Sequence, residues 1–415
     1  MKQIYRYLIT QIWNERRSNI ALLLELFIIA CIMFIIVDAG WCMHLLYSEP
    51  MGSDISHCYQ LETKFFGEDS PYYDTSPDGE SVKYETRMNL LEMVRNDENV
   101  EYAAYSMGCA PYNLSAMISG YAIDSTFVSA RLVVCQPDFV HLFRLQSQNG
   151  MTAQQMADAL EKNEVLISSN LVEGDSARYL VGKMLSAWDG KHRVAGLVQP
   201  LKRIEREGLD NECSKAYIFR LERGDIENGW LDFSVRVKAG RDRQFEERIR
   251  RQIKDRELRV GNLFVSGVKR YETLREEIMA QDRTTLQMPL MIGGFLLFNV
   301  FLGLLGTFWF RTQQRFPEIG LQKAMGATRS DVALRLMCEA VILLSIAFLP
   351  SILIDYNLAV RGVTRLYNGL TFEGGRFCIT LGLTYLILLV VILVGIWFPT
   401  RQAARTNPID VLRNE

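Results

Sequence analysis

Gly182 and Lys183 come nearest to a phosphate-binding loop in this chain. That pattern also needs a glycine five residues before Gly182 and Ser or Thr after the lysine. The chain has Ala177 and Met184 there, so the pattern fails. The sequence shows no nucleophile elbow or paired-carboxylate signature, and no metal-ligand spacing among its histidines. These histidines are His44, His57, His141 and His192. Nothing in the sequence supports a catalytic centre or a metal site.

A stretch at residues 311–331 has a more distinctive pattern. Pro317 suits the first position of a helix, and Glu318 in its first turn complements the helix dipole. Gly326 suits the left-handed position that ends a helix. Thr328 and Asp331 resemble a capping box that starts the next helix. We therefore expect a helix of about nine residues that either lies on lipid or docks on a cytoplasmic partner.

Two acidic residues, Glu25 and Glu339, interrupt otherwise apolar stretches. Ionisable groups inside a membrane are costly, so each is a candidate functional site. The alternative, which we favour, is that both reach the cytoplasmic interface or pair with arginines one or two turns away. These arginines are Arg16, Arg17 and Arg335. Asp38 is expected to be hydrated at the outer rim.

Four long apolar stretches must position these residues. Residues 286–310 and 377–398 contain no Asp, Glu, Lys or Arg, and residues 20–37 and 336–354 contain one Glu each. An apolar run of about 18 residues or more is typical of a transmembrane helix. The sequence therefore predicts an α-helical membrane domain with four transmembrane helices in a 1+3 arrangement. A mixed α+β extracytoplasmic domain is inserted between helices 1 and 2.

Basic residues in the short flanks predict the orientation. Basic residues precede the first span at Lys2, Arg6, Arg16 and Arg17, and follow the last span at Arg401, Arg405 and Arg413. Five more lysine and arginine residues lie from Arg311 to Arg335. With four spans these segments share one side, so both termini are expected to be cytoplasmic. The large domain is then outside. The net charge of −2 sums two compartments, and no basic stripe suggests nucleic acid.

The predicted boundaries follow from these runs. We expect a cytoplasmic amphipathic segment at 1–18, transmembrane helix 1 at 19–45, and the extracytoplasmic domain at 46–267. A stalk and transmembrane helix 2 follow at 268–310, a coupling loop at 311–331, and transmembrane helix 3 at 332–354. A short outer loop at 355–376, transmembrane helix 4 at 377–398 and a cytoplasmic tail at 399–415 complete the chain.

The large domain contains patterns of both strands and helices. Predicted strands are Ala103–Met107, Val133–Val134, Val165–Ser168, Val194–Val198 and Phe233–Val237. Predicted helices are Glu85–Arg95, Thr152–Lys162 and Arg243–Arg256. Four cysteines, Cys58, Cys109, Cys135 and Cys213, would permit up to two disulfides in an oxidising compartment, with three connectivities.

An apolar repeat leads from the large domain into the second span. Val268, Tyr271, Leu274 and Ile278 recur at three and four residues. We predict one long helix from Lys269 to Phe310 whose outer half is a stalk. The alternative is a separate amphipathic helix that ends near Pro289.

Residues 315–327 and the tail carry a family resemblance. The pattern Arg315-x-x-Glu318-Ile319-Gly320-x-x-x-Ala324-x-Gly326-Ala327 resembles the loop of ABC-transporter permeases of the macrolide-exporter and FtsX type. The tail, with Pro408, Leu412 and Arg413, resembles the same family, as does the 1+3 layout. Weaker matches are Gln136–Val140, Val165–Ser168, Val181–Lys183 and Arg193–Val198.

This resemblance implies a function and partners. The chain would be a non-catalytic permease without a fused ATPase domain, passing ATP-driven motion to its periplasmic domain ("mechanotransmission"). ATP and Mg would bind a separate cytoplasmic ABC ATPase dimer, and this chain itself would hold no cofactor. The resemblance assigns coupling to Arg315, Pro317, Glu318, Ile319, Gly320, Ala324, Gly326, Ala327, Pro408, Leu412 and Arg413.

The resemblance leaves more than one process open. One is efflux or extraction of a hydrophobic or peptide-like substrate from the bacterial inner membrane through an adaptor and outer-membrane channel. Another is an FtsX-like regulatory or sensory complex that controls a cell-envelope hydrolase or kinase. In each, a second permease copy or paralogue completes a dimer. A membrane-anchored receptor or enzyme without an ATPase is a third alternative.

Overall fold

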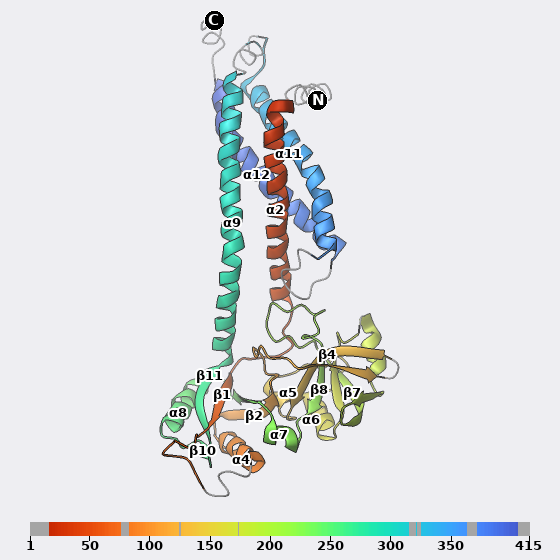
Figure 1. The fold of residues 1–415 in the computed structure, drawn as a ribbon, viewed down its shortest axis with the longest axis vertical. Coiled ribbons are helices and arrows are strands. Elements are labelled where there is room, and N and C mark those ends of the chain that lie inside the picture. The colour runs from red at the N-terminus through yellow and green to blue at the C-terminus, as the bar shows by residue number, and fades with distance from the viewer. Residues whose placement is uncertain are drawn as a thin grey trace. The chain divides into compact units, whose positions relative to one another are not determined.

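The computed structural model describes residues 16–75, 83–123, 126–172, 174–314, 321, 325–362 and 372–405. Two compact units make up the chain. A helical unit contains residues 1–44, 283–366 and 371–415, and an α/β unit contains residues 45–282 with 367–370. Figure 1 labels their elements, and the position of one unit relative to the other is not determined.

Three helices of the described chain are long and apolar enough to cross a membrane. They are Ile20–Ser48 in α2 (Arg16–Ser48), Ser330–Val360 in α11 (Arg329–Val360) and Gly374–Trp397 in α12 (Gly374–Arg405). A shorter apolar stretch, Leu290–Gly303, lies in α9 (Tyr271–Gln314). Three of the four predicted spans therefore meet the length and apolarity of a transmembrane helix.

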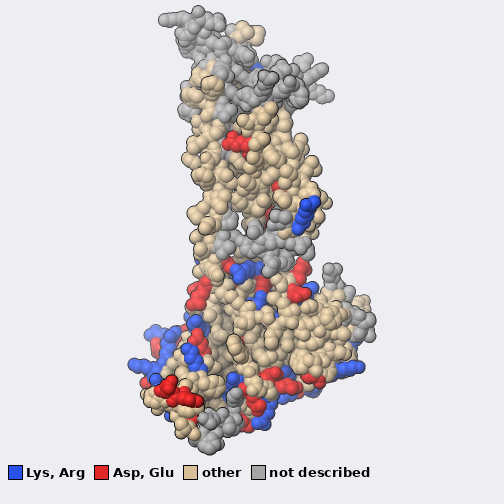
Figure 2. Space-filling model, viewed as in Figure 1, with Lys and Arg blue, Asp and Glu red and all other residues tan. Residues whose placement is uncertain are grey.

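The helical unit has an apolar core shared by α2, α11 and α12. Leu26 and Ala30 of α2, Leu343 and Leu344 of α11, and Leu388 of α12 are buried in one cluster. Figure 2 shows few charged side chains on this unit and many on the α/β unit. The surface of these helices thus suits an apolar solvent.

The predicted outer loop at 355–376 is wrong at both ends. Helix α11 continues past Ile354 to Val360, and α12 begins at Gly374. Asp355 therefore lies inside α11, where it is fully buried. Packing of Phe34, Ala359 and Phe377 extends the helices beyond the runs without charge.

The predicted stalk begins three residues later than its apolar repeat suggests. Val268 belongs to strand β11 (Leu263–Arg270), opposite Leu61, and not to the helix. Helix α9 starts at Tyr271 and continues through Pro289 to Gln314. The single-helix prediction therefore holds beyond Tyr271, and the alternative break near Pro289 does not.

The α/β unit contains an eleven-stranded sheet in the order β10-β11-β1-β9-β2-β4-β3-β6-β7-β5-β8. Its first half is antiparallel and contains β10 (Arg259–Val260), β11, β1 (Cys58–Phe65), β9 (Leu231–Val237) and β2 (Val100–Met107). One residue pair, Ser106 and Cys135, joins β2 to β4 (Thr126–Cys135). This narrow junction divides the sheet.

The second half of the sheet closes on itself. It contains β4, β3 (Ile118–Ile123), β6 (Met184–Ala187), β7 (Gly190–Val198), β5 (Val165–Ser168) and β8 (Ala216–Arg220). A parallel pairing of β4 with β8 joins the two ends into a six-stranded barrel. Closure leaves no free edge within this half.

Helices cover both faces of the antiparallel half. Helices α4 (Lys83–Arg95) and α8 (Asp242–Lys254) share one core with Tyr59 and Val235. Helix α5 (Phe139–Leu142) and Tyr271 share the opposite core with Cys58. Helices α6 (Ala153–Glu161) and α7 (Arg223–Asn228) and the 3-10 helix η1 (Gly174–Leu180) complete the unit.

The mixed α and β prediction for this unit is confirmed. Strand β5 has the predicted bounds, and the other four predicted strands lie within β2, β4, β7 and β9. Phe233, Val235 and Val237 are buried in one core, as their alternation predicts.

Candidate coupling site

The turn at Gly326 adopts the predicted conformation. Its φ is +101°, in the left-handed region that favours glycine. The capping box follows, because Asp331 N donates to Thr328 Oγ1 at 3.2 Å and Thr328 N donates to Asp331 Oδ2 at 2.9 Å. These bonds fix the start of α11 immediately after the turn. Ala327 between them is half-buried.

The chain before this turn presents apolar side chains. Leu321 is 59% exposed and Met325 is 74% exposed, and Met325 N donates to Leu321 O at 3.0 Å. The other predicted coupling residues lie outside the described chain. These are Arg315, Pro317, Glu318, Ile319, Gly320, Ala324, Pro408, Leu412 and Arg413. Their coupling role stays a prediction.

The two intramembrane glutamates lie in different environments. Glu25 is half-buried, and its Oε1 lies 3.1 Å from the point where a Cβ on Gly303 would be, so α2 and α9 approach closely there. Glu339 is 2% exposed within the helical unit. Its side chain therefore does not reach the surface of the helical unit, and its functional role stays a prediction.

Asp38 is not hydrated, and that prediction was wrong. It is 1% exposed, and its Oδ1 lies 3.4 Å from Nε of Arg376, which is itself 8% exposed. The early start of α12 brings Arg376 to α2. A buried ion pair therefore joins the first and last predicted spans.

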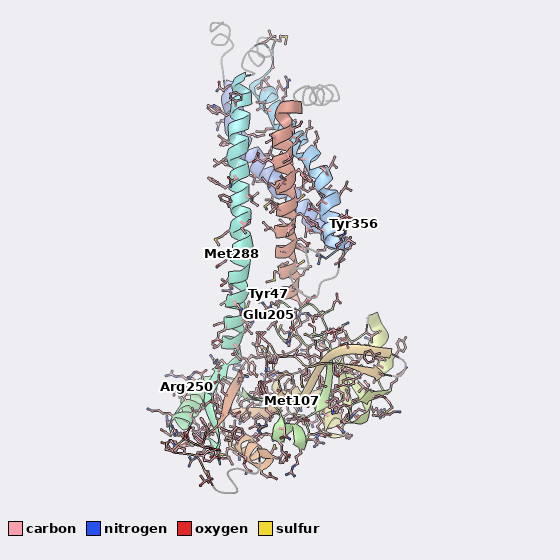
Figure 3. All side chains as sticks on the ribbon, in the orientation of Figure 1. Tyr47, Met107, Glu205, Arg250, Met288 and Tyr356 are labelled. Atoms are coloured by element: carbon pink, nitrogen blue, oxygen red, sulfur yellow. The ribbon has the colours of Figure 1, made fainter. Side chains whose placement is uncertain are left out.

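A set of polar side chains, here called the junction network, joins three segments of the α/β unit. The segments are the end of α2, residues 201–207 and the first three turns of α9. The network consists of Tyr47, Lys202, Glu205, Arg206, Arg275 and Asp282. Figure 3 labels Tyr47 and Glu205.

Asp282 is the point where all three segments meet. Its Oδ2 accepts a hydrogen bond from Tyr47 at 2.9 Å, and its Oδ1 pairs with Nη1 of Arg206 at 2.7 Å. The carboxylate is 5% exposed, so these contacts are shielded from water. The end of α2 is thereby tied to α9.

Lys202 binds the last turn of α2. Its side chain is fully buried, and Nζ donates to Leu46 O at 2.7 Å and lies 3.2 Å from Glu49 Oε2. Burial lowers the pKa of Lys202, while Glu49 opposes that shift. The contact consumes a carbonyl at a helix end that would otherwise be unsatisfied.

Glu205 connects α9 to the loop after β2. Its Oε1 pairs with Nε of Arg275 at 2.7 Å and accepts a hydrogen bond from Tyr112 at 2.9 Å. Burial and the neighbouring Glu205 raise the pKa of Tyr112. The hydrogen bond to Glu205 raises the pKa of Arg275.

The first residue of α9 is anchored in the core. Tyr271 is fully buried, its hydroxyl lies 2.7 Å from Ser234 Oγ, and its ring meets Phe143 edge-on. Leu274 and Ile278 pack against the same core. This confirms the packing that the repeat Tyr271, Leu274 and Ile278 predicts.

Sequence reasoning missed the junction network. Its members come from segments up to 235 residues apart, and charged residues at 202–207 look like an ordinary surface loop. The available signal was the density of alternating charge at residues 202–207, just after Pro200, and this pattern does not identify the partners.

The described residues show neither a disulfide nor a group of side chains suited to a metal ion. All eight cysteines are free thiols. Burial raises the pKa of Cys58 to about 12 and that of Cys109 to about 11. Within the described ranges, no group of three or more His, Cys, Asp or Glu side chains could hold a metal ion.

One family model matches the C-terminal part of this chain. Residues 290–408, which include α11, α12 and the Gly326 turn, match the family model "FtsX-like permease C-terminal". This part of the chain is therefore similar to ABC-transporter permeases of the MacB/FtsX type.

The relatives that match this chain are distant in sequence. The macrolide export ATP-binding/permease protein MacB of Campylobacter jejuni is 25% identical over 144 residues, which cover 35% of this chain and 22% of that protein. An uncharacterized ABC transporter permease, YknZ of Bacillus subtilis, is 29% identical over 136 residues, covering 31% of this chain and 30% of YknZ. The matches thus span less than a third of either relative.

A solved structure resembles part of the chain. The extracellular domain of the ABC-type transporter YknZ from Gram-positive bacteria aligns with 50% of this chain and 100% of its own length, at 14% identity and a TM-score of 0.31. That score is too low for the likeness to support a functional conclusion.

Proposed function

We propose that this chain is the membrane subunit that carries ATP-driven motion from a separate ABC ATPase to its extracytoplasmic domain. Such a relay needs two structural features, which are a docking element for the ATPase and a stiff connection to the α/β unit. The Gly326 turn, with exposed Leu321 and Met325, supports the first.

The junction network carries the proposal. It ties the end of α2 and the first turns of α9 to the same segment, residues 201–207. Because these contacts are largely buried, a displacement of either helix end must move the α/β unit or break several hydrogen bonds.

The orientation follows the basic flanks, with both termini cytoplasmic and the α/β unit outside the bacterial inner membrane. Leu290–Gly303 in α9 completes the fourth span. Two such permeases, or this chain and a paralogue, would sit on an ATPase dimer that binds ATP and Mg. Several relatives bear the name macrolide export protein, which favours efflux or extraction of a hydrophobic or peptide-like substrate through an adaptor and outer-membrane channel.

A purification separates the parts of this proposal. The chain is isolated from native membranes with and without high salt, and ATPase activity is measured in both samples. We expect Mg-dependent hydrolysis only where an ABC ATPase co-purifies. Robust hydrolysis by the salt-stripped chain would overturn the permease assignment.

The regulatory alternative gives a different result in the same material. Vesicles that contain the complex should move a hydrophobic dye or peptide in an ATP-dependent way if the chain serves efflux or extraction. An active ATPase without any such movement, and with ATP-dependent control of a bound hydrolase or kinase, would favour the FtsX-like regulatory complex.

A further inference from the structure

The antiparallel half of the sheet splits beyond Leu61. Strand β1 pairs with β9 only from Cys58 to Leu61. Past that point, Thr63–Phe65 stays with β11, while Leu231–Asp232 stays with β2. Two strands that are neighbours at one end therefore diverge at the other.

A cavity of about 640 Å³ lies between the diverging ends of β1 and β9. One wall is β1, with Thr63 and Phe65, and the other is the start of β9, with Trp230 and Leu231. Met107 at the end of β2, labelled in Figure 3, also lines it. The volume lies in the range of ligand-binding clefts.

The rim of this cavity is apolar and exposed. Trp230 is 92% exposed, and Phe65 and Met117 are 50% and 43% exposed. Leu114, in the loop that lines the cavity, is 52% exposed. Large apolar side chains gathered around a hollow are typical of an interaction site.

The walls also offer main-chain groups. In an antiparallel ladder, every second residue of a strand directs its N–H and C=O away from its partner. Where β1 and β9 diverge, those groups face the cavity, because the described β9 residues no longer pair with Thr63–Phe65. An open strand edge is a template for another strand.

The two charged residues that line the cavity, Arg87 and Asp232, differ in how many of their hydrogen-bonding atoms are already used. Arg87 uses Nη1 alone to bind the carbonyls of Ile226 and Gly229, the latter at 3.1 Å. Asp232 already accepts bonds from Ala110 N at 3.1 Å and Asn113 Nδ2 at 3.0 Å. The cavity therefore favours an acceptor, such as a carbonyl or carboxylate, near Arg87.

We propose that this cavity binds an extended polypeptide segment with apolar side chains, which adds as a strand between β1 and β9. Its main chain bonds to the diverging edges, its side chains pack on Phe65 and Met117, and Trp230 folds over it. Only a peptide main chain matches both the strand edges and the apolar rim, whereas an acyl chain matches the rim alone. The inference goes beyond the relay function and needs no ATPase.

Binding of a labelled peptide to the full chain in lipid nanodiscs tests this proposal. The probe is a fluorescein-labelled hexapeptide of alternating valine and threonine with a free carboxylate, measured by anisotropy. We expect saturable binding that Trp230→Ala weakens at least fivefold. Trp188→Ala is the matched control, since Trp188 is a 61% exposed tryptophan on the barrel, and it should bind as the wild type does.

Two further arms keep the test decisive. Ala116→Trp should fill the cavity and block binding while the Trp230 side chain itself is retained. A peptide with every second amide nitrogen methylated loses strand donors and should not bind. Absence of saturable binding, equal binding of the methylated peptide, or full competition by decanoate would overturn strand addition; the last result would indicate an acyl ligand.

Discussion

Removal of the hydrogen bond between Tyr47 and Asp282 should show that the end of α2 is fastened to α9. The oxygen atoms lie 2.9 Å apart, and Asp282 also holds Arg206 at 2.7 Å. A hydrogen bond to a charged group contributes about 1.5–3 kcal/mol. Because Tyr47 is half-buried, we expect about 1–2 kcal/mol from it.

A double-mutant cycle isolates that contribution. Tyr47→Phe should lower the free energy of unfolding by about 1–2 kcal/mol, and Asp282→Ala by about 2–3 kcal/mol, because it also loses the pair with half-exposed Arg206. The double variant should resemble Asp282→Ala, so the coupling energy should equal the Tyr47→Phe effect, about 1–2 kcal/mol.

Chemical denaturation of the full chain in detergent, followed by circular dichroism, measures these values. The control cycle combines Tyr47→Phe with Arg250→Ala on the exposed face of α8, where the effects should add. Additivity of Tyr47→Phe and Asp282→Ala within about 0.3 kcal/mol would refute the fastening.

Three other predictions address separate parts of the chain. Gly326→Val should strain the turn by about 1–3 kcal/mol and reduce binding of the ATPase. Gly326→Asn should retain most of that binding, because asparagine tolerates the left-handed conformation. Equal ATPase binding by the two variants would exclude the turn from docking. Arg376→Ala should destabilise the helical unit by about 3–5 kcal/mol, because the buried Asp38 loses the cation of Arg376. The loss should be seen as faster proteolysis, and Asp38→Asn in the same chain should restore resistance. With its pKa raised to about 12, Cys58 should react slowly with maleimide at pH 8 and about tenfold faster per pH unit, while unfolding should remove the protection.

Local signals in the sequence were sufficient to predict the turn at Gly326 and its capping box, because both depend on residues within five positions of each other. The long apolar runs predicted α2, α11 and α12, because the length and apolarity of a continuous segment can be read from the sequence alone. Strand β5 was predicted because a short run of apolar and small residues is typical of a buried strand. All four of its residues are buried in the structure.

Long-range pairing accounts for what the sequence did not reveal. Val268 has helical spacing to Tyr271, but pairing with Leu61, 207 residues earlier, places it in a strand. Lys202 bonds to Leu46 across 156 residues, and neither residue signals the other. The apolar run at 336–354 ended before Asp355, although packing against α2 and α12 carries the helix further.

The relay itself is tested most directly by a reporter on the α/β unit. A fluorophore on Glu277→Cys, at an exposed position of α9, is followed in nanodiscs with the ATPase bound as Mg-ATP is added. The account predicts an ATP-dependent change that the Tyr47→Phe, Asp282→Ala double variant diminishes while ATP hydrolysis continues. An identical change in that variant, or no change in the native chain during hydrolysis, would contradict it.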